Sequence, residues 1–111
     1  MFLYNRVNKE ELKKKIAEDT TQRTTLSFYK YVIIENPEEL RDIFFYDWSI
    51  LGVLGRIYLA KEGINAQLSL PTVKFDLFKE QLYADKRFTD VPFKIAVEDD
   101  GKSFYKLAIK V

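Results

Sequence analysis

Hydrophobic and polar residues alternate with a period of two along three stretches of the chain, at 24–34, 53–60 and 64–70. A period of two places successive side chains on opposite faces of a strand, so each stretch predicts a half-buried β-strand. The turn Lys61-Glu62-Gly63 separates the last two stretches and predicts a β-hairpin. A final strand is predicted at 104–111 and an extra strand at 93–97.

A helix is predicted after the first strand, because Asn36 is a typical cap and Pro37 suits the first helical position. Gly52 follows the last helical turn, where glycine commonly ends a helix. The apolar positions recur at helical spacing. They are Leu40, Ile43, Phe44, Trp48 and Leu51.

A second helix is predicted from a cap at Thr72 to about Ala84, burying Phe75, Phe78 and Leu82. An additional N-terminal helix is predicted from a cap at Asn8. The order strand, helix, strand, strand, helix, strand predicts an α+β, ferredoxin-like (βαββαβ) sandwich. We expect residues 1–111 to form this single domain, with the N-terminal helix and an extra C-terminal strand as additions to it.

In this fold, two helices cover one face of an antiparallel sheet and leave the other face open. Alternation predicts that the covered face carries Leu26, Phe28, Val32, Ile57, Leu59, Ile64, Ala66, Leu68, Leu107 and Ile109. Lys30 falls among them, which predicts a place at the end of the sheet or beside a bulge. The open face is predicted to carry Thr25, Ser27, Tyr29, Tyr31, Arg56, Tyr58, Asn65, Gln67, Phe104, Lys106 and Lys110.

The predicted open face combines aromatic rings, cations and amides, a combination that RNA-recognition sheets use to stack and read bases. Candidate RNA-binding residues are Tyr29, Tyr31, Arg56, Tyr58, Asn65, Gln67 and Lys106. The same face also suits burial beneath another domain, because exposed aromatic patches commonly mark interfaces. The sequence leaves both interpretations open.

The amino-acid composition excludes several kinds of catalysis by this chain. The 111 residues include no cysteine and no histidine, which excludes thiolate nucleophiles and imidazole acid–base catalysis by this chain. We expect no catalytic residue, metal site or cofactor here, and Glu62 and the pair Asp99-Asp100 are interpreted as turn residues. The formal net charge is only +1, so any contact with nucleic acid is expected to be local. No membrane span or signal peptide is predicted, which favours a cytoplasmic protein.

Three segments together resemble one family. They are Arg23-Thr-Thr-Leu-Ser-Phe-Tyr-Lys-Tyr31, Gly55-Arg-Ile-Tyr-Leu-Ala-Lys-Glu-Gly-Ile-Asn-Ala-Gln-Leu-Ser69 and Asp99-Asp-Gly-Lys-Ser-Phe-Tyr-Lys-Leu107. The chain is similar over nearly its whole length to the N-terminal region of the bacterial rhodanese-domain tRNA uridine hydroxylases. The long hairpin segment is the most specific of the three.

The resemblance implies an acylphosphatase-like domain ahead of a rhodanese domain that carries an active cysteine. It also implies oxygen-dependent conversion of the wobble uridine of certain tRNAs to 5-hydroxyuridine. Because this chain has no cysteine, we expect it to be the N-terminal module alone, with tRNA and a downstream rhodanese domain as its partners. A purely structural, domain-interface module is the alternative. A free-standing acylphosphatase is disfavoured, because Val32–Pro37 holds neither a glycine-rich phosphate loop nor an arginine.

Overall fold

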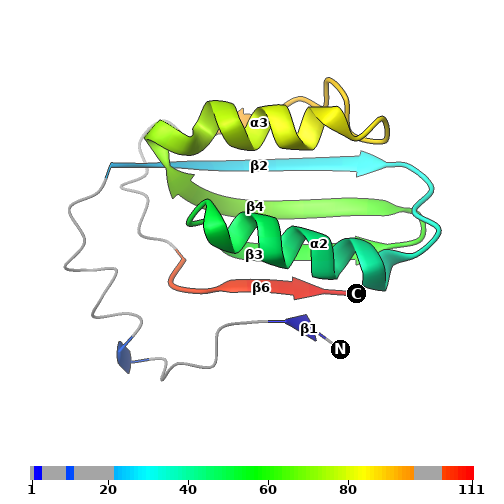
Figure 1. Cartoon of the computed structure of the whole chain (residues 1–111), viewed down its shortest axis with the longest axis horizontal. Coiled ribbons are helices and arrows are strands. Elements are labelled where there is room, and N and C mark those ends of the chain that lie inside the picture. Colours follow the sequence, from blue (N-terminus) through cyan, green and yellow to red (C-terminus); the bar gives the residue numbers. More distant parts are fainter. Residues whose placement is uncertain (1, 4–9, 12–21, 97–103) are drawn as a thin grey trace.

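The computed structural model describes residues 2–3, 10–11, 22–96 and 104–111 of the chain. Its sheet has the strand order β1-β6-β3-β4-β2-β5. Figure 1 shows helices α2 and α3 lying across one face of this sheet, as the sequence predicts. The strands are β1 (Phe2–Leu3), β2 (Arg23–Tyr31), β3 (Leu54–Ala60), β4 (Gly63–Pro71), β5 (Lys94–Ile95) and β6 (Leu107–Lys110).

The pairing of the strands identifies the ferredoxin-like unit. Strand β4 lies between β3 and β2 and is antiparallel to both, and β5 is antiparallel to β2 on its other side. The short β5 is therefore the fourth strand of the βαββαβ unit. Strand β6 is the extra C-terminal strand, and it adds in parallel to β3 at the opposite side of the unit. The sequence pattern predicted both strands but assigned them wrongly, because it took 93–97 as the extra strand and the final strand as the one that completes the unit.

Helix α2 (Pro37–Ile50) begins and ends with the predicted residues. The side chain of Asn36 accepts a hydrogen bond from the backbone N–H of Glu39, at 3.2 Å, and Pro37 occupies the first turn. Gly52 adopts a left-handed conformation, with φ of +79°, just past the cap residue Leu51. Ile43 was wrongly included in the predicted apolar stripe of this helix. Its side chain is 46% exposed, because it lies beside the buried face of the helix rather than on it.

Helix α3 (Phe75–Ala84) begins differently from the prediction. A short 3₁₀ turn, Thr72–Lys74, precedes it, and Thr72 makes no side-chain capping hydrogen bond. The hydroxyl of Thr72 instead pairs with that of Thr24, at 2.9 Å, which ties this turn to the start of β2. Thr72 was therefore wrongly predicted as the cap. In the predicted N-terminal helix, Glu10 and Glu11 are helical, and the remainder lies outside the described residues.

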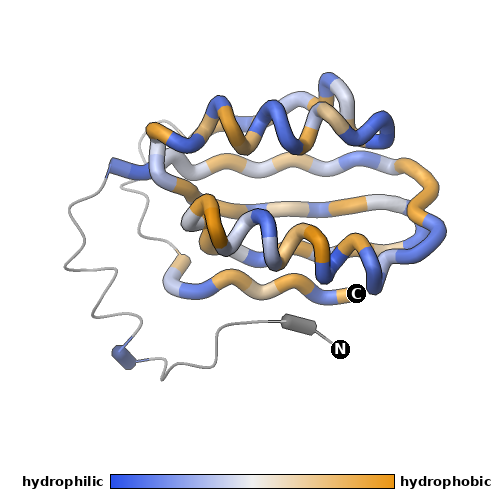
Figure 2. The backbone as a smooth tube through the Cα atoms, viewed as in Figure 1, coloured by the Kyte–Doolittle hydropathy of each residue, from blue (hydrophilic) through white to orange (hydrophobic). Residues whose placement is uncertain are grey.

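The hydrophobic core fills the space between the helices and the covered face of the sheet. Figure 2 shows hydrophobic and hydrophilic positions alternating along the strands, as a sheet with one covered face requires. The core contains a chain of aromatic contacts in which Phe44 stacks on Trp48 and Trp48 packs against Phe78. Buried residues on the strands include Leu26, Phe28, Ile57, Leu59, Ile64, Ala66, Leu68, Leu107 and Ile109, which confirms the predicted covered face. No helix among the described residues is long and apolar enough to cross a bilayer.

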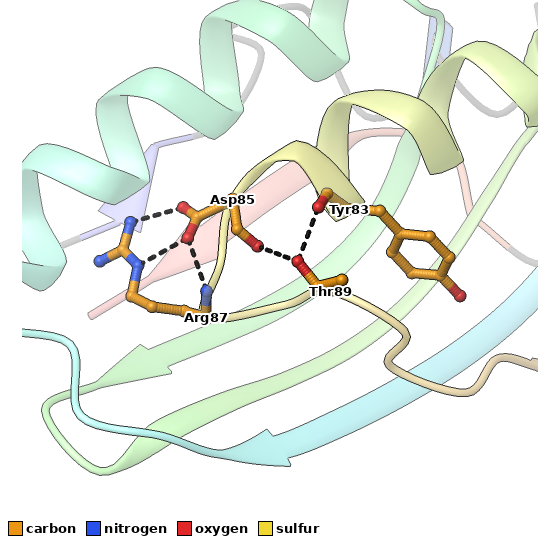
Figure 3. A network of polar contacts seen from close by, with 4 residues as sticks. All are labelled: Tyr83, Asp85, Arg87 and Thr89. Carbon is orange, nitrogen blue, oxygen red and sulfur yellow. Dashed lines mark hydrogen bonds and ion pairs between the residues drawn. The ribbon is translucent and has the colours of Figure 1, made fainter.

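The loop from α3 to β5 is fastened by a network of polar contacts, shown in Figure 3. Asp85 forms an ion pair with Arg87, with 2.6 Å between Oδ2 and Nη2, and also accepts from the backbone N–H of Arg87. The hydroxyl of Thr89 donates to the carbonyl oxygens of Tyr83 and Asp85, which lie at the C-terminal end of α3. These contacts satisfy helix-end carbonyls and hold the loop in position to deliver β5 to the sheet edge.

This network predicts a pH dependence of stability. The hydrogen bond from the Arg87 side chain lowers the pKa of Asp85 below its ordinary value. A lowered pKa stabilises the fold above the unfolded-state pKa of about 3.9, and that contribution is lost as pH falls through the folded-state pKa. We expect Asp85→Asn to lower the free energy of unfolding by about 0.5–1 kcal/mol near neutral pH. Thermal unfolding of both proteins across pH should show this difference closing in acid. Glu80→Gln, which removes an exposed carboxylate of α3, is the control, and an unchanged difference in acid would contradict the assignment.

Candidate functional site

Two rows of side chains cross the open face of the sheet, one residue from each strand. In the first row, Tyr29 of β2 lies opposite Asn65 of β4, and Asn65 lies opposite Tyr58 of β3. Tyr58 in turn lies opposite Lys110 of β6. Tyr29 and Tyr58 are 68% and 51% exposed, so the helices do not cover their rings. The first row therefore presents two aromatic rings with an amide between them and a cation at one end.

The second row runs beside the first, two residues away along each strand. Ser27 lies opposite Gln67, Gln67 opposite Arg56, and Arg56 opposite Ala108 of β6. Gln67 and Arg56 are exposed. Together the two rows bring Arg56, Tyr58, Asn65 and Gln67 into one patch. The sequence prediction that these four residues share the uncovered side of one platform is confirmed.

The two remaining candidate residues lie at opposite ends of this platform. Tyr31 is 83% exposed near the end of β2, and its ring packs edge-on against that of Tyr29, with 6.1 Å between the centroids. Lys106 lies just before β6, and its backbone carbonyl accepts a hydrogen bond from Gly55 at 2.8 Å. It lines a hollow with Arg56 at the β3–β6 side of the face. All seven candidate residues are therefore on or bordering the open face.

Arg23 closes one end of the open face. Its guanidinium donates to the carbonyl oxygens of Gly52, at 2.6 Å, and Ser69, at 3.1 Å, and its Nε donates to the Ser69 hydroxyl. These contacts join the end of α2 to β4, and Ser69 is buried. Arg23 is thus a structural cation, whereas Arg56 presents its charge on the exposed face.

Lys94 is the residue that sequence reasoning missed. It pairs with Ser27 across the β2–β5 edge, which extends the second row by one exposed cation. Its neighbour Phe93 packs on the covered side, against Phe28 and Phe78. The alternation in Phe93-Lys94-Ile95 indicates that Phe93 and Lys94 face opposite sides of a strand. It places Lys94 on the open face only when β5 is known to pair with β2.

No group of three or more His, Cys, Asp or Glu side chains suited to a metal ion occurs among the described residues. At the start of α2, where an acylphosphatase would need a phosphate cradle, the Asn36 side chain already accepts from the N–H of Glu39. Glu62 is exposed in the hairpin turn, and its backbone carbonyl accepts from Val32 at 3.0 Å.

Comparison with known proteins adds a second line of evidence. The family model described as "UPF0176 acylphosphatase like domain" matches residues 23–111, from the first residue of β2 onward. A protein of Leptospira interrogans named tRNA uridine(34) hydroxylase is 57% identical over 109 residues, covering 98% of this chain and 30% of that protein. Proteins of the same name from Salmonella typhimurium and Salmonella arizonae are 48% and 47% identical over 110 residues, each covering 98% of this chain and 31% of theirs. The chain thus spans about 30% of the length of these curated relatives.

Proposed function

Because this chain belongs to the UPF0176 acylphosphatase-like domain family, we propose that it positions tRNA for a tRNA uridine-34 hydroxylase. Its open sheet face would hold the single-stranded anticodon region that contains the wobble uridine. The rhodanese part of such an enzyme, with its cysteine, would supply the oxygen-dependent formation of 5-hydroxyuridine. We assign no step of that chemistry to this chain, which has neither cysteine nor histidine.

The single observation that carries the proposal is the row Tyr29–Asn65–Tyr58, which crosses three adjacent strands on the uncovered face. Proteins that recognise single-stranded RNA splay its bases onto aromatic side chains and read their edges with polar groups. The two tyrosines supply rings, and Asn65 supplies an amide between them. Arg56, in the adjoining row, supplies a charge for the phosphate backbone.

Binding of an anticodon stem-loop tests this proposal. A stacked base contributes about 1–3 kcal/mol, so Tyr58→Ala should weaken binding by roughly 5- to 150-fold. Arg56→Ala should also lower the slope of log affinity against log salt by about 0.7, as expected for one lost phosphate contact to a single strand. Fluorescence anisotropy of a labelled stem-loop over a salt series measures both effects.

Tyr46→Ala is the matched control, because Tyr46 is 69% exposed on α2, in the layer opposite the open face. Lys86→Ala, which removes an exposed cation after α3, controls for charge. Both variants should bind like the wild type. If Tyr58→Ala also bound like the wild type, the tyrosine row would not be the RNA platform. If the wild-type chain showed no salt-sensitive binding, an independent RNA-binding role would fail.

A domain interface is the second candidate function, since Tyr29 and Tyr31 are exposed on a domain whose relatives continue well beyond it. Joining this chain to the remainder of the Leptospira protein allows the two functions to be separated. Oxidative footprinting should leave Tyr29 and Tyr58 reactive in the joined protein and protect them only when tRNA is added. Protection without tRNA would favour the interface instead.

A further inference from the structure

Strand β2 is only partly paired on its β5 side. It runs to Tyr31, but β5 pairs with it only at Leu26 and Ser27. Extending that register by two residues places Pro92 opposite Tyr29. Because proline has no backbone N–H, it cannot donate to the carbonyl oxygen of Tyr29, and the ladder ends before it. This side of β2 is therefore unpaired from Tyr29 onward.

The backbone groups of β2 point alternately to its two sides. Even-numbered residues turn toward β4, and in the same direction the N–H of Val32 donates to a carbonyl of the β3–β4 turn, at 3.0 Å. Odd-numbered residues turn toward β5, where the carbonyl oxygen of Thr25 accepts from Ala96 at 2.9 Å. The register with β4 is unbroken along the whole of β2. The N–H and C=O groups of Tyr29 and Tyr31 therefore point out of the unpaired side.

Ile33 continues this unpaired side past the end of β2. The N–H groups of its neighbours Val32 and Ile34 both donate to carbonyls of the β3–β4 turn, which leaves the backbone of Ile33 on the outer side. Among the described residues, none forms a hydrogen bond with the backbone of Tyr29, Tyr31 or Ile33 on that side. Residues 29–33 thus form one open edge. Its outward N–H and C=O groups match the backbone of an added strand.

The open edge is also apolar. No charged residue occurs within Tyr31–Ile34, and the Ile33 side chain is 77% exposed. Native edge strands usually carry charges or prolines that prevent pairing with another strand. A hollow of about 560 Å³ lies along the edge, lined by residues of β2, among them Tyr29, and by Pro92 and Phe93. This hollow leaves room for alternate side chains of an added strand.

The shortness of the open edge favours an occupant that belongs to the same protein. Its outward residues provide only a few hydrogen bonds, each of small net value because water competes for the same groups. A separate partner would therefore bind weakly, whereas a segment joined to the domain is present at about millimolar effective concentration. The curated relatives are long enough to supply such a segment, because this chain covers only 30% of the Leptospira protein.

We infer that the open edge takes up an extended segment from the remaining part of such a longer protein, as an added β-strand. The N–H and C=O groups of the segment pair with those of Tyr29, Tyr31 and Ile33 in the plane of the sheet. The rings of Tyr29 and Tyr31 stand out of that plane, so the added strand lies beside them and leaves the open face accessible. This inference shares with the proposed function only the premise that the domain works within a longer hydroxylase.

Hydrogen–deuterium exchange, followed amide by amide with nuclear magnetic resonance, tests this inference. The chain alone is compared with the chain joined to the remainder of the Leptospira protein. In the joined protein, the amides of Tyr31 and Ile33 should exchange at least about tenfold more slowly. The amides of Lys30 and Val32 are the internal control, because they face β4 and the β3–β4 turn in both proteins and should not change. Unprotected Tyr31 and Ile33 amides, or equal slowing of both sets, would refute the added strand.

Two substitutions at one position separate backbone pairing from contact with the ring. Tyr31→Pro removes an outward N–H but no hydrogen bond to β4, and in the joined protein it should return Ile33 to the exchange rate of the chain alone. Tyr31→Ala also loses the ring but keeps the N–H, so it should retain the protection. Ile33→Pro lies beyond the last pair of the β2–β4 ladder and serves, with Tyr31 as the reporting amide, if Tyr31→Pro does not fold. Protection retained in the proline variants, or lost in Tyr31→Ala, would refute backbone pairing.

The same measurement identifies other occupants of the open edge. Protection that grows with concentration of the chain alone would identify a second copy, and protection that requires tRNA would identify RNA; either result would overturn the inference. Stem-loop binding that depends on Tyr58, with no edge protection in the joined protein, would refute the added strand alone. Edge protection without any stem-loop binding would refute the RNA-positioning function and leave a structural module.

Discussion

Gly63→Ala is expected to lower the free energy of unfolding by about 3 kcal/mol or more. Gly63 begins β4 with a φ of +154°, a conformation that residues with a side chain rarely adopt. A Cβ at this position would overlap the carbonyl oxygen of Lys30 and approach the Cα of Tyr31 to 3.1 Å. Because these are backbone atoms of the paired strand β2, they cannot move aside without breaking the β2–β4 ladder. Urea unfolding followed by circular dichroism measures the loss.

Gly52→Ala is the matched control for this substitution. Gly52 also has a positive φ, of +79°, but a Cβ there would meet only the ring of Pro71, at 3.2 Å. The left-handed conformation alone costs about 1–2 kcal/mol. The control should therefore be clearly less destabilised than Gly63→Ala. Equal losses in the two variants would show that backbone conformation, rather than contact with β2, sets the cost at residue 63.

Phe78→Ala is expected to lower the free energy of unfolding by about 3–5 kcal/mol. The Phe78 side chain is fully buried, at the centre of the aromatic core, and contacts Phe28, Trp48 and Phe93. Its removal leaves a cavity in the layer that joins α3 to the sheet. Domains of this kind are stable by only about 5–15 kcal/mol in total, so the loss is a large fraction of stability.

The sole tryptophan reports this change directly. Trp48 lies 5.3 Å from Phe78, measured between ring centroids, so its fluorescence follows the packing of the same layer during denaturant unfolding. Val73→Ala is the control, because Val73 is 86% exposed just before α3 and should change stability by no more than about 0.5 kcal/mol. A wild-type-like midpoint for Phe78→Ala would mean that the core repacks around the gap.

Local patterns were sufficient to predict the covered and open faces. Alternation along β2, β3 and β4 depends only on which neighbours in sequence are apolar, and it placed Tyr58 and Asn65 correctly on the open face. The start of helix α2 was equally predictable, because its cap Asn36 forms its hydrogen bond within the first turn of that helix. In each of these cases, the residues that determine the structure are close together in the sequence.

The rest of the architecture depends on contacts between distant segments. Nothing within Lys94–Ile95 indicates that this strand pairs with β2, nor does β6 itself indicate a parallel neighbour in β3. The Thr72 cap was predicted wrongly for the same reason, because its hydroxyl bonds to Thr24, 48 residues away. The hollow beside Ala108 depends on the pairing of β6 with β3. The sequence therefore predicted Lys106 and Arg56 as candidate binding residues, but it could not show the hollow that they line.

The separation of the two sheet faces has a consequence for how such domains diverge. Along β2, β3 and β4, every second side chain belongs to the core, while the intervening ones, such as Gln67, face outward. Replacing an outward residue changes the chemistry of the open face at little cost to folding, because exposed substitutions usually alter stability by no more than about 0.5 kcal/mol. Related domains are thus able to vary this face by drift at alternate positions, while the buried set keeps the fold constant.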